Sequence, residues 1–320
     1  MSKLGDWLKK STDRVRTEGV DGIYWALMSF YGKVLMKRIS ENTFNYGVPI
    51  FERDWDVLVI VDACRADMMA EVSNEYPFVS DNSIDSVASQ TGVWHDRNFV
   101  DKYRDEMKNT ALITSCEHAS RRFSDDDFLI FDEVHSYTYD AENRVMPARP
   151  LTDRAISVGR EHNPDRMIVH YKQPHFPVLP WLPEYGTKTD EKPANWDSIR
   201  QGSIIAYWPT IREGDVSLDD AWTGQKENLR FVMDEVELLI DNIDAEKLVI
   251  SSDHGNAFGE YGFYGHPANI PIKALREVPW CITSASDSGE YTPANYDRSK
   301  QIENDGYTRD QILKDLGYKI

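Results

Sequence analysis

Residues 251–267, "SSDHGNAFGEYGFYGHP", combine side chains that bind metal ions with a backbone rich in glycine. Asp253 and His254 are adjacent, and four glycines separate them from His266. Carboxylate oxygens and imidazole nitrogens are ligands that Mn²⁺, Zn²⁺ or Mg²⁺ accept. Glycine lets the backbone pass close to a metal or an anion. The stretch therefore predicts part of a metal site rather than a loose surface loop.

Short apolar segments predict the strands that would position this site. They lie at 56–63, 110–115, 166–172, 247–253 and 278–284. Their nearly continuous apolar character is typical of strands covered on both faces, as in a parallel sheet. Helical patterns alternate with them, at 65–76, 91–107, 151–162 and 217–243. The sequence thus predicts an α/β fold with a mostly parallel central sheet and helices on both faces.

Polar side chains stand at the ends of these predicted strands, where open α/β sheets bind their ligands. The first strand ends in Asp62, and the fourth ends in Asp253 and His254. The third strand contains His170 and is followed by His175. Two structural alternatives remain open: Asp62 could cap the helix that follows it, and His170 could be a hydrogen-bonded core residue.

Four segments together resemble the sulfatase branch of the alkaline phosphatase superfamily. Residues 251–266 resemble its SDHGxxxGExGxxxH segment, 56–67 ("DVLVIVDACRAD") its first strand, and 170–177 ("HYKQPHFP") its HxxxPHxP segment. Residues 86–99 ("SVASQTGVWHDRNF") fall where the family has its nucleophile segment, CxPSR or TxPSH. The segments occur in the family's order, so the resemblance implies the family's fold and a metal-dependent hydrolase or transferase.

The resemblance also implies roles for individual residues. Thr91 takes the nucleophile position, and His95 the position four residues later. A divalent cation (Mn²⁺, Zn²⁺, Mg²⁺ or Ca²⁺) would be held by Asp62, Thr91, Asp253 and His254. His175 and His266 would act on the phosphoryl group, with Arg65 and Lys172 as further substrate residues. The family's two-metal members carry a DxxxH segment, whereas Asp165 precedes His170 by five positions, which favours one cation. A second cation would use His170, His175 or His266.

Departures from the family pattern bear on the substrate. Val93 and Trp94 replace the usual Pro and Ser, and no Cys or Ser occupies a CxPxR context that could become formylglycine. This favours phosphate esters or diesters, attacked through a phospho-threonine intermediate, over sulfate esters. The ester could belong to a lipid or a polysaccharide. The alternatives are a sulfatase and a non-catalytic binding protein that retains the fold.

Two other assignments of the nucleophile compete with Thr91. Thr91 could be a helix N-cap without chemistry, which would leave Ser89 as the nearest hydroxyl. Cys116 and Arg122 stand at the Cx5R spacing of cysteine-dependent phosphatases, in which an arginine and backbone amides bind phosphate. The odd number of cysteines, Cys64, Cys116 and Cys281, predicts buried thiols rather than disulfides.

The chain is strongly acidic, with a formal net charge of −18. That field repels nucleic acid, so nucleic-acid binding is not expected. It suits a protein hydrated in concentrated salt and predicts a halophilic origin, with an ordinary acidic protein as the alternative.

The N-terminal region has the opposite charge balance. Residues 1–40 carry eight Lys/Arg against four acids, a net of +4. We expect residues 1–45 to form an amphipathic helical segment ahead of a catalytic domain at 46–320. The helix would pack on that domain or bind an anionic membrane surface. With no signal peptide recognised, the expectation is a cytoplasmic protein, at the inner membrane surface in the second case. Residues 176–217 predict a lid, and 308–320 a last helix.

Overall fold

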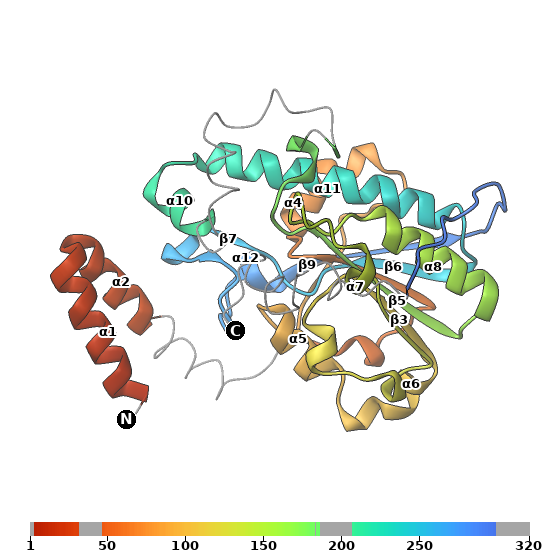
Figure 1. Cartoon of the computed structure of the whole chain (residues 1–320), viewed down its shortest axis with the longest axis horizontal. Coiled ribbons are helices and arrows are strands. Elements are labelled where there is room, and N and C mark those ends of the chain that lie inside the picture. The colour runs from red at the N-terminus through yellow and green to blue at the C-terminus, as the bar shows by residue number, and fades with distance from the viewer. Residues whose placement is uncertain (1–2, 32–46, 183, 186–206, 299–320) are drawn as a thin grey trace.

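The computed structural model describes residues 3–31, 47–182, 184–185 and 207–298 (Figure 1). The helix predicted at 308–320 and most of the lid predicted at 176–217 lie outside these residues. Within the lid, a short 3₁₀ turn covers Leu179–Trp181 and helix α10 covers Tyr207–Glu213.

A seven-stranded sheet forms the centre of the molecule, in the order β2-β9-β6-β1-β5-β3-β4. β1 pairs in parallel with β5 and β6, and β3 pairs in parallel with β4 and β5. β9 runs antiparallel to both β6 and β2. The fold is therefore α/β with a mostly parallel sheet, as predicted. The strands are β1 (Val57–Asp62), β2 (Ser83–Asp85), β3 (Thr110–Thr114), β4 (Ile130–Glu133), β5 (Arg166–Pro174), β6 (Ala245–Ser251) and β9 (Glu277–Ala285).

All five predicted strands are present. The two that the sequence did not reveal, β2 and β4, are short strands at the edges of the sheet, and most of their residues are partly exposed. Edge strands bury only part of their surface and so lack the continuous apolar run that marked the others. A separate hairpin, β7 (Ala257–Phe258) with β8 (Tyr264–Gly265), lies within the glycine-rich stretch.

Helices cover both faces of the sheet (Figure 1). Val57, Val59 and Val61 of β1 point into one core, to which α4, α8 and α11 contribute. Leu58 and Ile60 point into the opposite core, to which α5 and α6 contribute. The strand's two-residue period thus places the two sets on different faces. The helices are α4 (Ala66–Val72), α5 (Thr91–Asn98), α6 (Arg104–Lys108), α7 (His135–Thr138), α8 (Arg149–His162), α11 (Leu218–Ile240) and α12 (Lys273–Arg276).

The helix predicted over 91–107 is interrupted. α5 ends at Asn98, Phe99 has φ −100° and ψ 79°, and α6 begins only at Arg104 after a 3₁₀ turn. The ring of Phe99 packs against Phe51, Phe123 and other aromatic rings. Packing of that partly buried ring against the second core overrides the local helical preference.

The N-terminal region forms two helices, α1 (Lys3–Glu18) and α2 (Val20–Phe30), that contact each other. Gly19 joins them with φ +59°, a conformation that glycine adopts without strain. Tyr31 stacks on Phe263 with ring centroids 5.6 Å apart, which connects this pair to the rest of the chain. In the described part of the chain, no helix has the length and apolar character needed to cross a bilayer.

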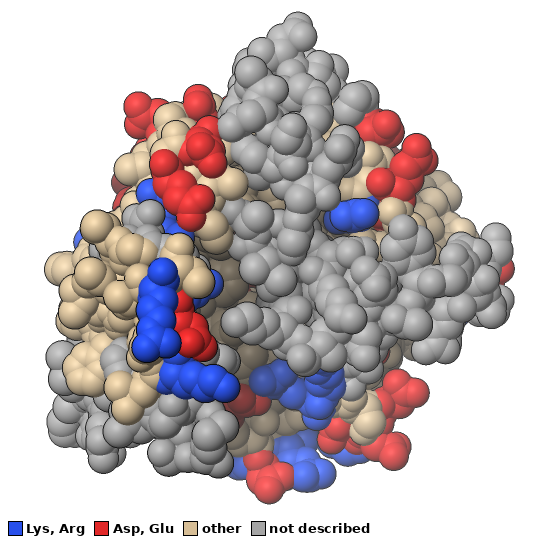
Figure 2. Space-filling view, turned by 60° about the vertical axis from the view of Figure 1, so that its left-hand side comes forward, with Lys and Arg blue, Asp and Glu red and all other residues tan. Residues whose placement is uncertain are grey.

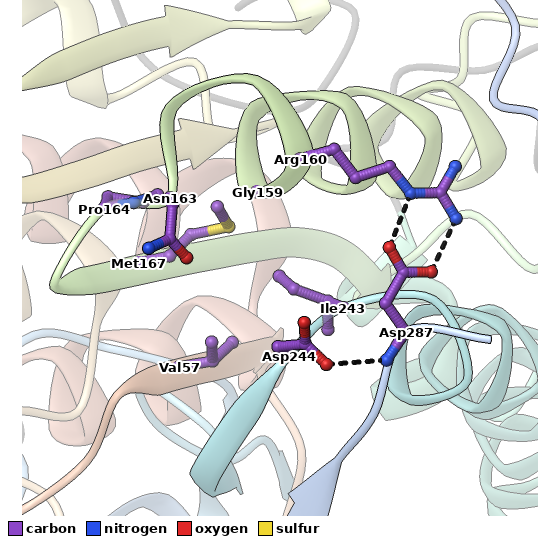
Figure 3. A pocket seen from close by; sticks show the side chains of 9 residues that line it. All are labelled: Val57, Gly159, Arg160, Asn163, Pro164, Met167, Ile243, Asp244 and Asp287. Atoms are coloured by element: carbon purple, nitrogen blue, oxygen red, sulfur yellow. Dashed lines mark hydrogen bonds and ion pairs between the residues drawn. The ribbon is translucent and has the colours of Figure 1, made fainter. Parts of the chain in front are cut away.

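A pocket lies where β1 begins, at Val57 (Figure 3). Arg160 and Asp287 form an ion pair of 2.7 Å in it, and Asp244 accepts the backbone N–H of Asp287. Arg160 and Asp287 therefore satisfy each other, and the pocket lies at the opposite end of the strand from Asp62.

Burial at the sheet centre predicts the effect of two matched substitutions. Ile60→Ala removes a side chain that is 1% exposed, so the free energy of unfolding should fall by about 2–5 kcal/mol. Ile282→Ala makes the same change on β9 at a side chain that is 51% exposed, and should cost less than about 1 kcal/mol. Urea unfolding of both variants measures the difference; equal costs would contradict the burial of Ile60 in this core.

Candidate active site

The carboxyl ends of β1 and β6 bring Asp62, Asp253 and His254 to the first turn of α5, where Thr91 stands. Nε2 of His254 lies 3.1 Å from Oγ1 of Thr91, 3.2 Å from Oδ2 of Asp253 and 3.8 Å from Oδ1 of Asp62. All four side chains are at most 2% exposed. The structure therefore brings together the four residues that the sequence suggested as ligands of one cation.

The carboxylates of this cluster are short of hydrogen bonds. Neither Oδ atom of Asp62 has a hydrogen-bond partner in the described residues, and the same holds for Oδ2 of Asp253. Burying unsatisfied carboxylate oxygens is costly, and a bound cation removes that cost. Asp62 does not cap α4, because the N-cap of that helix is Arg65. The capping alternative for Asp62 is thus wrong, and the donor set fits a divalent ion.

The two carboxylates differ in acidity. Burial, and then repulsion from Asp253, raise the pKa of Asp62 well above its ordinary value. Burial acts in the same direction on Asp253, but attraction to the protonated forms of His254 and His170, together with the hydrogen bond from the backbone N–H of Ala63, holds its pKa below the ordinary value. Oδ1 of Asp253 accepts from Ala63 N at 3.1 Å and from His254 N at 2.9 Å, which fixes the carboxylate in place.

His254 presents a lone pair to the cluster. Its Nδ1 lies 3.0 Å from the carbonyl oxygen of Gly255, which can only accept, so Nδ1 carries the proton and Nε2 does not. Burial lowers the pKa of His254, which keeps the ring neutral. A neutral imidazole whose other nitrogen donates to a carbonyl is the usual state of a metal-bound histidine.

His175 and His266 share this arrangement and lie beside His254. Nδ1 of His175 lies 2.8 Å from the carbonyl oxygen of Phe176, and Nδ1 of His266 lies 2.8 Å from Oδ1 of Asn256. The ring of His266 is 5.1 Å from that of His175 and 4.6 Å from that of His254. Burial lowers the pKa of both histidines well below the ordinary value.

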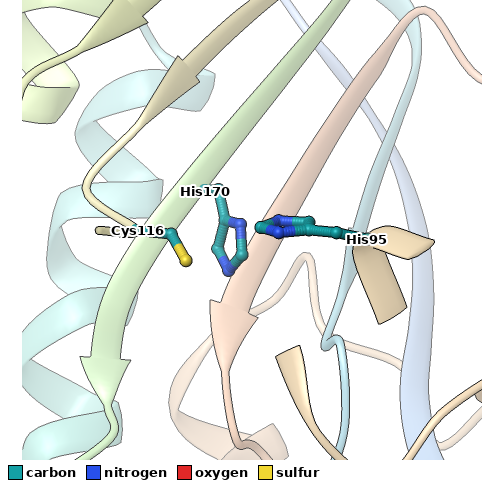
Figure 4. A group of neighbouring side chains, drawn as sticks. All are labelled: His95, Cys116 and His170. Atoms are coloured by element: carbon teal, nitrogen blue, oxygen red, sulfur yellow. The ribbon is translucent and has the colours of Figure 1, made fainter. Parts of the chain in front are cut away.

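His170 and His95 form a different group. Their ring centroids are 5.9 Å apart, and each has a ligand atom within 4.8 Å of the other's and of the Sγ of Cys116 (Figure 4). His95 lies one helical turn after Thr91, and its ring packs against Phe99 and Phe123. The structure therefore associates His170 with Cys116 rather than with the His175–His266 pair.

Lys172 forms ion pairs with two acidic side chains and is not exposed for contact with a ligand. Its Nζ lies 3.1 Å from Oε1 of Glu117 and 3.5 Å from Oδ2 of Asp62, and the side chain is 2% exposed. Burial acts to raise the pKa of Glu117, but Lys172 and His118 outweigh it and hold that pKa at about 2. Sequence reasoning missed Glu117 as part of the site; its position directly after Cys116, at the end of β3, was the available signal.

Asn228 of α11 was also missed, although it positions His175. Its Nδ2 lies 3.1 Å from the carbonyl oxygen of Pro174, and 3.0 Å from those of His175 and Pro177. Its Oδ1 accepts from Leu179 N at 3.1 Å. One buried amide therefore holds the whole turn that follows β5. No pattern in the helix sequence indicates this, because the partners lie about 50 residues away along the chain.

Other predicted residues have structural partners. Arg65 pairs with Asp67 at 2.6 Å and also with Glu260, so acids rather than a substrate occupy its guanidinium. Oγ of Ser89 donates to the carbonyl of Pro267 at 2.9 Å and accepts from Ile270 N at 3.0 Å, which leaves it poorly suited as a nucleophile. Thr91 is the first residue of α5, whose N-cap is Gln90, so the N-cap alternative is wrong.

The cysteine-phosphatase alternative also conflicts with the structure. Burial, and then Glu117, raise the pKa of the Cys116 thiol well above its ordinary value, which disfavours the thiolate nucleophile. Arg122 forms an ion pair with Asp96 at 2.7 Å.

The glycines after His254 permit close packing of the loop. A Cβ at Gly255 would lie 2.3 Å from the carbonyl oxygen of Ala274, and Gly265 has φ +72° with Trp208 against it. From the sequence, we expected these glycines to make room for a metal or an anion. In the structure, the groups packed against these two glycines are other parts of the chain.

The unsatisfied carboxylates predict how a cation changes stability. Mn²⁺ should raise the melting temperature of the wild-type protein, by the equivalent of about 2.7 kcal/mol at 100 times the Kd. Asp62→Asn removes a buried charge, so it should leave the metal-free protein at least as stable while losing most of the Mn²⁺ shift. Asp153→Asn is the control, because that buried acid binds Tyr291 and Tyr296 instead. An unchanged Mn²⁺ shift in Asp62→Asn would contradict the site.

Comparison with known proteins gives likenesses among solved structures; no family model and no curated protein matches the sequence. The soluble domain of lipooligosaccharide phosphoethanolamine transferase A from Neisseria meningitidis is 15% identical, with 71% of this chain and 75% of that chain covered and a TM-score of 0.45. The C-terminal periplasmic domain of EcEptC from Escherichia coli, in complex with Zn, is 13% identical, with 80% and 79% covered and a TM-score of 0.46.

A third structure, of BT4656 with its substrate D-glucosamine-2-N,6-O-disulfate, is 13% identical, with 84% of this chain and 77% of that chain covered and a TM-score of 0.48. These TM-scores are below 0.5, so function must be inferred from the contacts of this chain's own residues. The structures to which the chain is similar include phosphoethanolamine transferases and sulfatases, members of the alkaline phosphatase and sulfatase-like superfamily.

Proposed function

We propose that the protein is a metal-dependent hydrolase or transferase of phosphate esters or diesters, with Thr91 as its nucleophile. One observation carries the proposal: the Thr91 hydroxyl lies 3.1 Å from His254, in a buried cluster in which both oxygens of Asp62 and one of Asp253 accept no hydrogen bond from the described residues. The four sequence segments that resemble the superfamily support the same assignment.

Asp62, Asp253, His254 and Thr91 fit a divalent cation by donor type and by their unsatisfied oxygens. Such an ion supplies Lewis acidity, which lowers the pKa of the bound hydroxyl and neutralises charge on the phosphoryl oxygens. Thr91 also stands in the first turn of α5, where the helix dipole favours negative charge.

The covalent step forms a bond between Oγ1 of Thr91 and phosphorus and breaks the bond between phosphorus and the ester oxygen. The hydroxyl proton passes to solvent, and the departing alkoxide takes a proton from water. Water then cleaves the phospho-threonine in hydrolysis, or an acceptor alcohol takes the phosphoryl group in transfer; either regenerates the hydroxyl. No residue in a CxPxR context offers the aldehyde hydrate used by sulfatases, which favours phosphate over sulfate.

His175 and His266 have a role that follows from their protonation. Both rings are neutral and carry their proton on Nδ1, so each presents an Nε2 lone pair. Two lone pairs repel the anionic oxygens of a phosphoryl group but attract a cation. We therefore favour the two-cation alternative, with these two histidines as ligands, over direct contact between neutral imidazoles and the substrate.

Substitution of the nucleophile tests the proposed reaction. With Mn²⁺ or Zn²⁺ present, Thr91→Val should lower turnover of a model phosphodiester by on the order of 10⁴-fold, whereas Thr91→Ser should keep a measurable rate. Mass spectrometry of acid-quenched wild-type protein should find phosphate on the peptide that contains Thr91. Full turnover by Thr91→Val would remove the nucleophile assignment.

A panel of phosphate monoesters, phosphodiesters and sulfate esters separates the alternatives. Turnover of sulfate esters alone would favour the sulfatase. No turnover of any ester by metal-loaded protein would favour the non-catalytic binding protein.

We also propose that the predicted N-terminal segment, residues 1–45, rests on an anionic membrane surface beside the catalytic domain at 46–320. Val20, Ile23, Leu27 and Phe30 recur at helical spacing along one side of α2, and their side chains are 80%, 48%, 64% and 44% exposed. Residues 1–40 also carry a net charge of +4 in a chain of net charge −18. Figure 2 brings this side of the molecule forward and shows basic and acidic side chains beside uncharged surface.

Vesicle sedimentation tests this orientation. The full chain should bind vesicles of an anionic phospholipid more tightly than zwitterionic ones, and rising salt should weaken binding. Leu27→Glu should release the protein, while Ile282→Glu, at an exposed apolar residue on β9, should not. Equal binding of the two variants would contradict a role for α2.

A further inference from the structure

The cluster of His95, Cys116 and His170 shares no residue with the four assigned to the first cation. It draws one residue from α5, one from the segment after β3 and one from β5 (Figure 4). One ligand atom of each residue lies within 4.8 Å of the others, and no side chain is more than 2% exposed.

Backbone contacts fix the positions of these residues. The N–H of Ser115 donates to the carbonyl of His170 at 2.9 Å, which holds the end of β3 against β5. The N–H of Cys116 donates to Oγ1 of Thr114 at 2.9 Å, which fixes the turn that carries the thiol. His95 reaches the same place from α5, which covers this face of the sheet.

One ring nitrogen of each histidine in the cluster is buried without a hydrogen-bond partner in the described residues. These atoms are Nδ1 of His95 and Nε2 of His170. Trp94 packs edge-on against His170, and Phe99 and Phe123 pack against His95. Buried ring nitrogens normally have hydrogen-bond partners, and these two lack them. Imidazole nitrogens and cysteine sulfur are both metal ligands.

We propose that His95, Cys116 and His170 form a further metal centre, selective for a borderline first-row divalent ion such as Zn²⁺. Nitrogen and thiolate ligands suit Zn²⁺ and Co²⁺, whereas Mg²⁺ and Ca²⁺ require oxygen. Zinc–ligand bonds of about 2.0–2.3 Å would require a closer approach of the three ligand atoms. Binding converts the Cys116 thiol to a metal-bound thiolate and releases its proton to solvent.

The surroundings support a cation at this position. Burial, followed by repulsion from His170, lowers the pKa of His95 well below the ordinary value, and burial lowers the pKa of His170 to about 4, so both rings are neutral. Among the charges that act on His170, Asp253 and Glu117 favour a nearby cation, whereas Lys172 opposes it. The surrounding aromatic rings exclude solvent, which is typical of a structural metal centre. Such a centre would link α5, which carries Thr91, to β3 and β5.

Cobalt substitution tests the centre without reference to turnover. Metal-free full-length protein is titrated with Co²⁺ while near-ultraviolet absorption is recorded, because only a thiolate ligand gives an intense sulfur-to-cobalt charge-transfer band. Wild-type protein should show the band, and Zn²⁺ should displace it while Mg²⁺ should not. Cys116→Ser should abolish the band and lower bound metal by one ion per chain.

The other thiols provide matched controls. Cys64→Ser and Cys281→Ser also replace buried cysteines and should keep the band. Asp62→Asn should keep it too, although that change disables the proposed catalytic site. His170→Gln tests the cluster through a second ligand and should weaken Co²⁺ binding at least tenfold (about 1.4 kcal/mol).

The outcomes separate clearly. Absence of the band in folded wild-type protein overturns the proposal, whether or not the protein hydrolyses esters. Persistence of the band in Cys116→Ser overturns it as well. If Cys116→Ser does not fold, the proposal is overturned by loss of the band in Cys64→Ser or Cys281→Ser, or by unchanged Co²⁺ affinity in His170→Gln.

Discussion

Repulsion between two buried carboxylates is the constraint on which the site depends. Asp62 and Asp253 are both fully buried, and three of their four oxygens accept no hydrogen bond in the described residues. Lys172 lies 3.5 Å from Asp62 but is shared with Glu117. With Asp253 nearby as well, the site holds three buried acids and one buried ammonium, and this excess of negative charge away from water is costly unless a cation joins them.

The surrounding fold holds Asp253 and His254 in place despite the cost of burying this negative charge. Backbone N–H groups of Ala63 and His254 fix Asp253, and the carbonyl of Gly255 fixes the tautomer of His254. Asn228 positions His175 by donating hydrogen bonds to the turn that carries it. Ligands that are preorganised in this way need little rearrangement when a cation or a substrate arrives, which is the general condition for electrostatic catalysis.

The sheet shows why part of the fold could be predicted. Strands such as β1 and β6 are buried on both faces, so they appear in the sequence as continuous apolar runs. The residues at the ends of these runs indicate the edge of the sheet at which the site lies. The sequence did not predict β2, because this strand lies at the edge of the sheet and is largely exposed. The sequence did not predict that the helix ends before Phe99. This end depends on aromatic rings from distant segments, whereas the local pattern favours a continuous helix.

The sequence by itself determined the kinds of ligand and their edge of the sheet, because strand ends and neighbouring residues such as Asp253 and His254 are local features. Only the tertiary structure decided which side chains meet. His170 precedes His175 by five residues, yet His170 joins His95 and Cys116 while His175 joins His266. Alternation along β5 points His170 toward the face covered by α5, and a turn held by Asn228 redirects His175. Both choices depend on packing between segments far apart in the chain.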